Sequence, residues 1–240
     1  MTKLPDRFEP YDDASQPGLR INGYPESMLR TPEQPLYKRP ATLTEITGPL
    51  NLAKKLKLGM NDLSRLKEGA PRAVGQLIWV AGRLLDEDGM PVKGSLIEIW
   101  QTNASGRYAH SSDAANPAPL DPNFSGVGRC VTDHEGRYCF LSIKPAAYPV
   151  PNNPERWWRA PHIHFSILGD GFMSRLVTQM YFPGDPLNQS DLLINTVPDA
   201  KGRERLVAKW TPMMRLERAD VIGFEHDIVV RGHRATPMGL

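Results

Sequence analysis

The stretch AVGQLIWVAGRLLDEDGMPVKGSLIEIWQTN, residues 73–103, decides the fold of this chain. It holds two runs rich in Val, Ile, Leu and Trp, and the sequence Asp86-Glu87-Asp88-Gly89 between them is typical of a turn. The pattern predicts one strand over residues 73–86 and a second strand over residues 94–103.

The same pattern of short apolar runs between turn residues continues to the end of the chain. We expect GRCVTD and GRYCFLSI to form a hairpin around His134-Glu135, in which Cys130 and Cys139 face each other. Two reduced thiols are expected there, with a strained cross-strand disulfide as the alternative. Regular strands separated by turns predict an all-β protein built as a β-sandwich. The remaining predicted strands are PHIHFSIL (161–168), RLVTQMYF (175–182) and GFEHDIVVRG (223–232).

The N-terminal part of the chain has a different character. Residues 1–47 are rich in Pro and charge, with scattered Tyr and Leu and no strand or helix period. Such a segment cannot bury itself, so we expect an arm that wraps on a partner or on its own domain. Residues 50–67 predict one or two short helices. Two more are predicted, one at Asp185-Pro186, with Asp as N-cap, and one over residues 204–210.

The composition fits a division into an arm with short helices, residues 1–72, and a β-sandwich domain, residues 73–240. Hydrophobic residues make up 40% and charged residues 23% of the 240, so a packed core is expected. The net charge of +2 gives no reason to expect nucleic acid or an anionic membrane as partner. No apolar run indicates a signal peptide or a membrane span, so we expect a cytoplasmic protein.

Two histidines are the first candidates for chemistry. His162 and His164 lie one pleat apart in a predicted strand, so both imidazoles point to the same face, while Ile163 points to the core. Such a pair can chelate one metal ion, but it also occurs in cupins, in zinc enzymes and on plain solvated faces. The remaining histidines provide no obvious third ligand; they are His110, His134, His226 and His233.

Tyr108 and Tyr148 are the other candidates, because both follow predicted strands in loops. Tyr108 ends the run Asn103-Ala104-Ser105-Gly106-Arg107-Tyr108, and Tyr148 lies in a loop bounded by prolines. Loops at the edge of a sandwich are where sites are usually built. Taken alone, however, a loop tyrosine is more often an amphipathic surface residue than a metal ligand.

Several motifs together resemble the intradiol ring-cleavage dioxygenase family. The resemblance covers nearly the whole chain, and the motifs follow one another with the order and spacing of that family. Two N-terminal segments resemble the iron-carrying chain of the two-chain members that cleave protocatechuate. They are Arg30-Thr31-Pro32-Glu33-Gln34-Pro35-Leu36 and Thr42-Leu43-Thr44-Glu45. The other motifs are Val80-Ala81-Gly82-Arg83-Leu84, Gly89-Met90-Pro91-Val92, Ile97-Glu98-Ile99-Trp100, Gly106-Arg107-Tyr108, and Tyr148 followed by Trp158-Arg159-Ala160-Pro161-His162-Ile163-His164.

The resemblance implies a non-heme Fe(III) ion bound by Tyr108, Tyr148, His162 and His164. Phenolate is a hard anionic donor, so two of them favour Fe(III) over Fe(II). Ferric iron binds O2 poorly, so an enzyme built on it should activate its organic substrate instead. By the same resemblance, Tyr148 is displaced by the substrate and takes one of its protons.

The resemblance also implies roles for residues around the iron. Arg159 is expected to face the substrate ring and to stabilise developing negative charge, with a surface salt bridge as the alternative. Gln179, Tyr24 and Tyr181 are expected to line the substrate pocket, although a strand Gln or Tyr is often only an inter-strand filler. The family often has Trp where this chain has Val150, and often the order Arg-Pro-Ala where this chain has Ala160 before Pro161. Both departures bear on substrate preference.

The expected partners are therefore a small catecholic substrate, O2, and a homologous α chain without iron that forms a hetero-oligomer with this chain. An alternative is a homodimeric enzyme for catechol or hydroxyquinol, but residues 50–67 are too short for the larger helical domain usual in those enzymes. An alternative from another class is a non-catalytic sandwich domain that binds a ligand, with His162 and His164 on a wet face.

Overall fold

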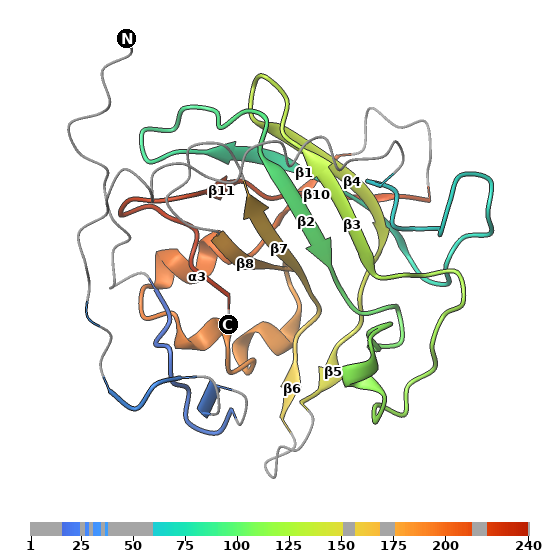
Figure 1. Ribbon diagram of the computed structural model, residues 1–240, viewed down its shortest axis with the longest axis horizontal. Helices are drawn as coiled ribbons and strands as arrows, with labels where there is room; N and C mark the ends of the chain where they lie inside the picture. Colours follow the sequence, from blue (N-terminus) through green and yellow to red (C-terminus); the bar gives the residue numbers. More distant parts are fainter. Residues whose placement is uncertain are drawn as a thin grey trace.

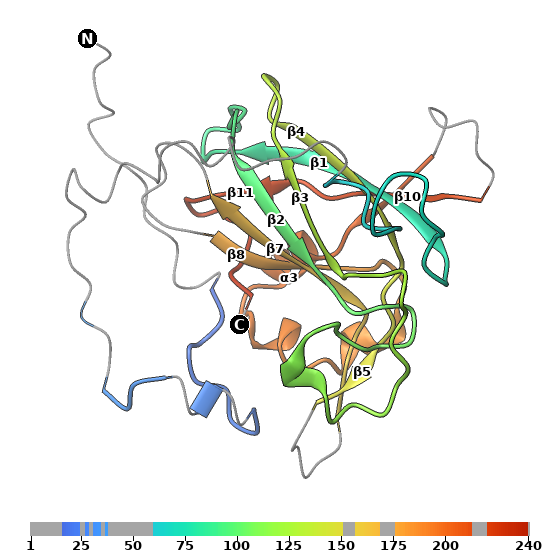
Figure 2. The same cartoon turned by 45° about the vertical axis from the view of Figure 1, so that its right-hand side comes forward.

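Two β-sheets packed face to face make up this protein, as the stacked strands in Figures 1 and 2 show. The all-β sandwich predicted from the sequence is confirmed. No helix among the described residues is long and apolar enough to cross a membrane. The computed structural model describes residues 16–24, 27–28, 31–34, 37, 60–150, 157–168, 176–212 and 220–239.

The first sheet is built around strand β1 (Leu77–Leu85), which comes from the stretch that opens the sandwich domain. On one side β1 pairs antiparallel with β4 (Arg137–Ile143). On the other side it pairs in parallel with two short strands in turn, so the sheet is closed by the C-terminal part of the chain. Those strands are β10 (Ile222–Glu225) and β11 (Ile228–Val229), with β9 (Lys209–Thr211) antiparallel to β10 at the edge.

The second sheet is antiparallel throughout and carries the histidine pair. Its strand order is β3-β2-β7-β8, and a separate two-stranded ribbon of β5 and β6 lies at one end of the sandwich (Figure 1). The strands are β2 (Leu96–Trp100), β3 (Val127–Val131), β7 (His162–Leu168) and β8 (Leu176–Tyr181), and the ribbon pairs β5 (Tyr148–Pro149) with β6 (Trp158–Arg159).

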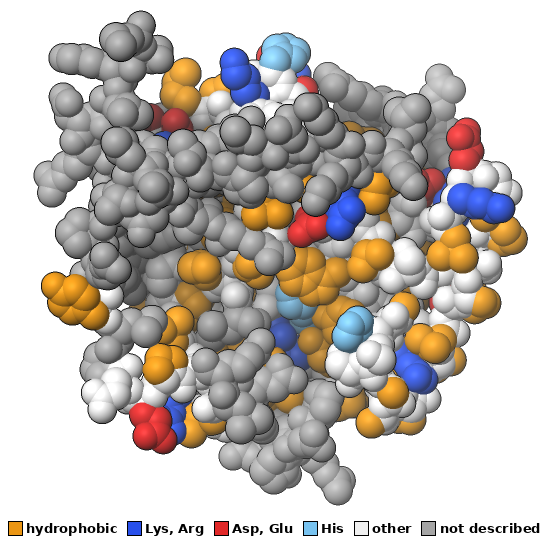
Figure 3. All heavy atoms as spheres, viewed as in Figure 1, with side chains coloured by type: hydrophobic (Ala, Val, Ile, Leu, Met, Phe, Trp, Pro, Cys, Tyr) orange, Lys and Arg blue, Asp and Glu red, His pale blue; other side chains and the backbone are white. Residues whose placement is uncertain are grey.

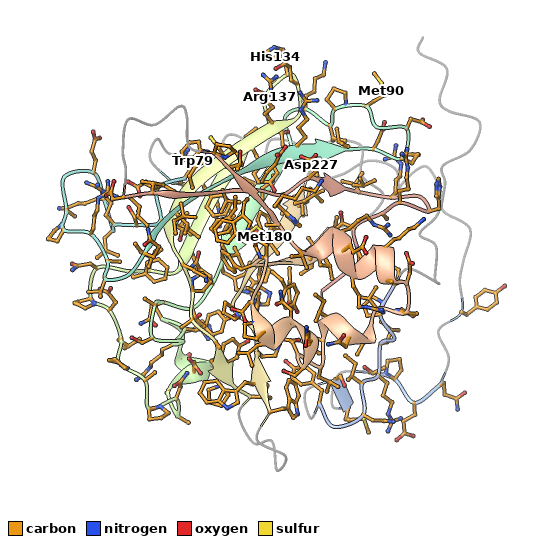
Figure 4. All side chains as sticks on the ribbon, turned by 180° about the vertical axis from the view of Figure 1, so that it is seen from behind. Trp79, Met90, His134, Arg137, Met180 and Asp227 are labelled. Carbon is orange, nitrogen blue, oxygen red and sulfur yellow. The ribbon has the colours of Figure 1, made fainter. Side chains whose placement is uncertain are left out.

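The core lies between the sheets, where alternate side chains of both meet. Val80 and Phe140 of the first sheet and Ile97 and Phe165 of the second are all fully buried in one cluster. Met180 lies in this interior in Figure 4, whereas His134, on an outer turn, and Arg137, at the start of β4, project outward. Burying one such apolar side chain contributes roughly 1.5–3 kcal/mol, so the pleated faces of the two sheets hold each other in place.

The predicted hairpin around His134-Glu135 is wrong. A turn does form there, with Gly136 donating to the carbonyl of Asp133 at 3.1 Å, but β3 then pairs with β2 and β4 pairs with β1. The turn therefore carries the chain from one sheet to the other. Cys130 and Cys139 consequently lie on different sheets, and both are free thiols, as expected.

The helices predicted over residues 50–67 are wrong for the part that the structure describes, residues 60–67, which form turns. Their backbone groups pair with the sandwich: Leu63 donates to the carbonyl of Leu141 at 2.8 Å, and the carbonyl of Met60 accepts from Arg129 at 2.9 Å. Leu63 enters the core beside Gly128, where a Cβ would come within 2.3 Å of it. Tertiary pairing therefore overrides the local helical pattern. Residues 50–59 lie outside the described residues.

The other short helices follow their caps. Asp185 caps a 3-10 helix, η4 (Pro186–Gln189), by accepting from the backbone of Leu187 at 3.0 Å, as predicted. The helix predicted over residues 204–210 instead begins earlier, as α3 (Ala200–Leu206), because Asp199 caps it. Beyond it the chain extends into β9. Two further 3-10 helices are η3 (Ser111–Asp113) and η5 (Ile194–Thr196).

The described part of the N-terminal arm packs on the sandwich domain. The side-chain oxygen of Gln16 accepts from the backbone of Met238 at 2.8 Å, and Ile21 is buried. This contact agrees with an arm that wraps on its own domain. Most of the arm lies outside the described residues, and the division of the chain at residue 72 stays a prediction.

Candidate metal centre

The two histidines of β7 point to one side of their sheet, toward the end where β5 and β6 lie. Ile163 and Phe165, which alternate with them, are fully buried in the core. The Nε2 atoms of His162 and His164 are 3.1 Å apart. Two imidazole nitrogens this close, aimed at the same point, are what the period of the strand predicts for a chelating pair.

The protein fixes the orientation of both imidazole rings. The Nδ1 atom of His162 lies 2.6 Å from the carbonyl oxygen of Ala160 and donates to it, so Nε2 carries the lone pair that a metal needs. His164 stacks flat on Trp100, its cross-strand partner on β2, with ring centroids 4.7 Å apart and planes 5° apart. Neither ring is therefore free to turn away.

Tyr108 reaches the histidines from the loop after β2. Its phenol oxygen lies 3.0 Å from Nε2 of His164. The loop is held by Asn103, whose side-chain oxygen accepts from the backbone of Ser105 and Arg107, and by Asp113, which accepts from the backbone of Tyr108 at 2.8 Å. Asp113 is the last residue of the short helix η3. Its buried carboxylate therefore fixes the backbone position from which the Tyr108 side chain extends.

Tyr148 comes from β5, and its ring lies 5.5 Å from that of Tyr108 and 5.7 Å from that of His162. The two tyrosine loops meet at Gly106, whose φ is 78° and where a Cβ would lie 2.3 Å from the carbonyl oxygen of Ala147. Only glycine allows this approach. The structure thus brings together all four residues that the sequence singled out as metal ligands.

The electrostatics of the cluster suit a bound cation. Burial and the nearby Arg159 charge lower the pKa of His162 well below its ordinary value, and burial does the same for the pKa of His164, so both imidazoles are neutral. Burial raises the pKa of Tyr148 and raises that of Tyr108 well above its usual range. Two phenols buried beside neutral imidazoles are a donor set that a trivalent ion deprotonates and binds.

No group of three His, Cys, Asp or Glu side chains suited to a metal is found in the described part of the chain. The phenol groups of Tyr108 and Tyr148 are oxygen donors of another kind that lie beside the two imidazoles. Among the other described histidines, His110 caps η3, His134 lies on the outer turn, and His226 is buried against Phe165.

Arg159 lies beside the cluster in the interior, so the surface salt bridge considered from the sequence is wrong. Its side chain is only 2% exposed. Its Nη2 atom donates to the side-chain oxygen of Gln179 at 2.5 Å and to the phenol of Tyr181 at 2.9 Å. Gln179 and Tyr181, which the resemblance placed along the substrate pocket, are thus both hydrogen-bonded to the arginine. Near the centre of the face in Figure 3, His and Lys or Arg side chains are visible between hydrophobic ones.

Asp191 is the residue that sequence reasoning missed. Its carboxylate is fully buried and accepts from Nε of Arg159 at 2.9 Å. No period or motif marks it, because it ends the polar run Asn188-Gln189-Ser190-Asp191, which begins inside η4. Tyr24, also expected at the site, packs near its edge with its ring 5.8 Å from that of Trp157, and its phenol adds to the rise in the pKa of Tyr108.

Comparison with known proteins places this geometry in context. A family model described as "Dioxygenase" matches residues 46–232. The protocatechuate 3,4-dioxygenase beta chain of Burkholderia cepacia is 47% identical over 98% of both chains. The protocatechuate 3,4-dioxygenase alpha chain of Pseudomonas putida is 31% identical over 69% of this chain and 77% of that one. The crystal structure of hydroxyquinol 1,2-dioxygenase from Pseudomonas putida DLL-E4 superposes with a TM-score of 0.51 at 26% identity, over 70% of this chain and 58% of that one.

Proposed function

Because the chain belongs to the dioxygenase family, whose intradiol ring-cleaving members it resembles in sequence, we propose that it cleaves protocatechuate with O2. The ring opens between the two hydroxylated carbons, and both oxygen atoms enter the product, 3-carboxy-cis,cis-muconate. The observation that carries the proposal is the meeting of Tyr108 with His162 and His164, with Tyr148 beside them. The 47% identity to a protocatechuate 3,4-dioxygenase beta chain favours this substrate.

We propose that these four side chains hold a non-heme Fe(III) ion. The two imidazoles are neutral, and Nε2 of His162 carries its lone pair because Nδ1 donates to Ala160. Two phenolates add the negative charge that distinguishes Fe(III) from Fe(II). When bound, ferric iron supplies the covalent coupling that makes a catecholate ring reactive toward O2.

Tyr148 is proposed as the group that takes a proton from the substrate. Its phenolate oxygen accepts the proton of a catechol hydroxyl group as the substrate binds, which leaves Tyr148 as a neutral phenol. Burial raises the pKa of Tyr148, which favours the neutral phenol that this transfer leaves. Tyr148 sits on the two-residue strand β5 at the end of the sandwich, outside both large sheets.

Arg159, Gln179 and Tyr181 are proposed to form the polar wall of the substrate pocket, with Tyr24 at its edge. The side chain of Arg159 is only 2% exposed and lies beside the cluster. Its guanidinium charge stabilises negative charge that develops on the ring oxygens during cleavage. Water is largely excluded around these groups, so the charge acts at close to full strength.

We propose an α chain homologous to this one as the partner in a hetero-oligomer. The 31% identity to a protocatechuate 3,4-dioxygenase alpha chain supports a common origin for the two kinds of chain.

Oxygen uptake tests the proposed function. The purified chain, with and without a co-expressed α chain, is given protocatechuate, catechol or hydroxyquinol, and product is measured together with uptake. We expect protocatechuate to be consumed fastest and the co-expressed pair to be more active. A preference for catechol or hydroxyquinol would assign the chain to those enzymes instead.

Colour separates an enzyme from a non-catalytic sandwich domain. Phenolate-to-Fe(III) charge transfer should make the iron-loaded protein red, and anaerobic protocatechuate should change the absorption. Colourless protein that has been given iron, with no oxygen uptake, would favour the domain that only binds a ligand.

A further inference from the structure

Asp191 accepts four hydrogen bonds with one fully buried carboxylate. Its Oδ2 atom accepts from Nε of Arg159 at 2.9 Å and from the backbone of Ala160 at 2.8 Å. Its Oδ1 atom accepts from the backbone of Leu193 at 2.9 Å and of Ile194 at 3.3 Å. The second pair binds the backbone at the start of η5 and uses only one of the two oxygens. The other oxygen faces the candidate metal centre.

This second oxygen connects to both sides of the site. Arg159 is one of its two donors, and the other donor is the backbone of Ala160, whose carbonyl accepts from Nδ1 of His162 at 2.6 Å. A single atom therefore fixes the guanidinium and also the residue that sets the tautomer and direction of one imidazole. We propose that Asp191 is a positioning residue for the proposed ring cleavage, acting through Arg159 and through Ala160 on His162.

The arrangement leaves one side of the guanidinium for the substrate. Nε of Arg159 is engaged by Asp191, and Nη2 is divided between Gln179 and Tyr181. Within the described residues no hydrogen bond is found for Nη1, so this nitrogen is the donor available to a substrate oxygen. Because the guanidinium is planar, holding Nε and Nη2 fixes the direction of the Nη1 protons as well.

Only a carboxylate fits this position. All four partners of Asp191 are donors, and a carboxylate has two acceptor oxygens and no proton to offer. An asparagine in the same place turns its NH2 group either toward Arg159 and Ala160 or toward Leu193 and Ile194. In each orientation donors face donors, so the side chain and its partners must shift. This makes Asp191→Asn a nearly isosteric probe of positioning.

The first experiment compares Asp191→Asn with Asp185→Asn in the chain co-expressed with its α chain. Asp185 caps the neighbouring helix η4, and within the described residues it makes no hydrogen bond or ion pair with Arg159. Its substitution therefore removes a carboxylate that also bonds the backbone at the start of a 3-10 helix. We expect kcat per bound iron to fall at least about tenfold in Asp191→Asn, with a smaller change in KM, because small displacements at a reacting centre are costly. The Asp185→Asn control should stay within about twofold of the wild type.

Iron content and the charge-transfer band are measured on the same samples. We expect Asp191→Asn to keep most of its iron and its colour, since the four proposed ligands are intact. If Asp191 serves the fold alone, thermal stability falls but kcat per bound iron is unchanged, and that result overturns the inference. Asp191→Glu is the second variant, because it keeps the charge while moving the oxygens by one methylene; it should fold and also lose kcat.

A double-mutant cycle tests the route through Arg159. We expect Arg159→Gln alone to lower kcat, and Asp191→Asn to lower it by less than about threefold further in that background, because residues that act through one another are not additive. Fully independent losses would contradict the route. The inference rests on the proposed function, but the two fail differently: wild-type protein without protocatechuate-dependent oxygen uptake ends the proposed function, whereas active wild type with an additive cycle ends only the role of Asp191.

Discussion

The two halves of the candidate metal centre are built in opposite ways. The imidazoles of His162 and His164 stand on a central strand, so hydrogen-bonded neighbours on both sides and the sandwich core behind fix their positions. The phenols of Tyr108 and Tyr148 come from a loop and from a two-residue strand at the end of the sandwich. A strand element has few ways to move without breaking the sheet, whereas a loop moves at lower cost.

This difference suggests a division of work within the site. The strand half, His162 and His164 on β7, would hold the proposed iron and keep the direction of the two imidazole ligands constant. In the proposed enzyme the loop half, Tyr108 and Tyr148, would supply the negative charge, and one of these two phenols would leave when substrate binds. Tyr108 is the more constrained phenol, because Asp113 holds its backbone and its oxygen contacts His164. Tyr148 is therefore the better candidate for exchange.

Removing a strand ligand should have the largest effect. In His164→Ala the site loses a donor that nothing nearby replaces, so we expect iron content to fall at least about tenfold and ring cleavage to be lost. Elemental analysis and oxygen uptake measure both. His134→Ala is the control, because His134 lies on the outer turn (Figure 4) and its loss should change neither quantity. Normal iron content in His164→Ala would contradict the assignment of this histidine as a ligand.

Removing the phenol oxygen of Tyr148 should lower the rate of ring cleavage more than the iron content. We expect Tyr148→Phe to keep part of its iron while kcat/KM falls by about 10²-fold or more, the usual contribution of a positioned acid or base. Tyr108→Phe is the contrast within the same half: it should lose more iron, because its oxygen lies 3.0 Å from Nε2 of His164. Full activity of Tyr148→Phe would show that this residue does not accept the proton.

The free energy of unfolding should also depend on pH, through a histidine packed behind the strand half. His226 is buried behind β7 with its ring 5.7 Å from that of Phe165, and burial lowers its pKa to about 4. The unfolded chain binds this proton near pH 6.5, so between pH 6.5 and 4 the unfolded state takes up more protons and the folded state loses stability as pH falls.

Lowering the pKa of His226 from 6.5 to about 4 corresponds to about 3 kcal/mol in the free energy of unfolding, of which the range from pH 7 to pH 4.5 covers roughly 2 kcal/mol. Chemical denaturation of the iron-free chain at pH 7 and pH 4.5, compared with His226→Leu, measures it. The variant should lose less stability on acidification than the wild type. An equal loss in both would mean that His226 does not titrate within the fold.

The sequence alone predicted more about the two histidines of the strand half than about the two tyrosines of the loop half. Alternation alone predicts that His162 and His164 share a face, because the period of a strand is a local property. The tyrosines entered as ligands only through resemblance to a family, since the contact of Gly106 with Ala147 depends on two loops that are distant in the chain. Asp191 has no local signature at all, because its function depends on the place where Arg159 ends in space.

The errors in the fold have the same origin. The turn at Asp133-Gly136 has the local pattern of a hairpin, but the pairing of β3 with β2 and of β4 with β1 is decided by distant strands. Residues 60–67 have helical periodicity, yet the backbone of Leu63 pairs with Leu141 instead. Local patterns thus predicted which segments are strands but not which strands are neighbours.

The smallest expected effect tests the contact that brings the tyrosine loops together. Gly106→Ala places a Cβ 2.3 Å from the carbonyl oxygen of Ala147 and also strains a residue with φ of 78°. Gly89→Ala is the matched control, because Gly89 has a φ of 81° and no atom within 4 Å of the added Cβ. The two variants share the cost of a positive φ, about 1–2 kcal/mol, so the difference between them isolates the contact of the loops.

We expect Gly106→Ala to be less stable than Gly89→Ala by about 1 kcal/mol or more, since overpacking a tight contact costs typically 1–3 kcal/mol. We also expect its charge-transfer band to weaken, because separating the loops moves Tyr148 away from Tyr108. Gly89→Ala should keep the band unchanged. If both variants show the same stability and the same band, the loops are held together by something other than this contact, and the loop half is stiffer than its construction indicates.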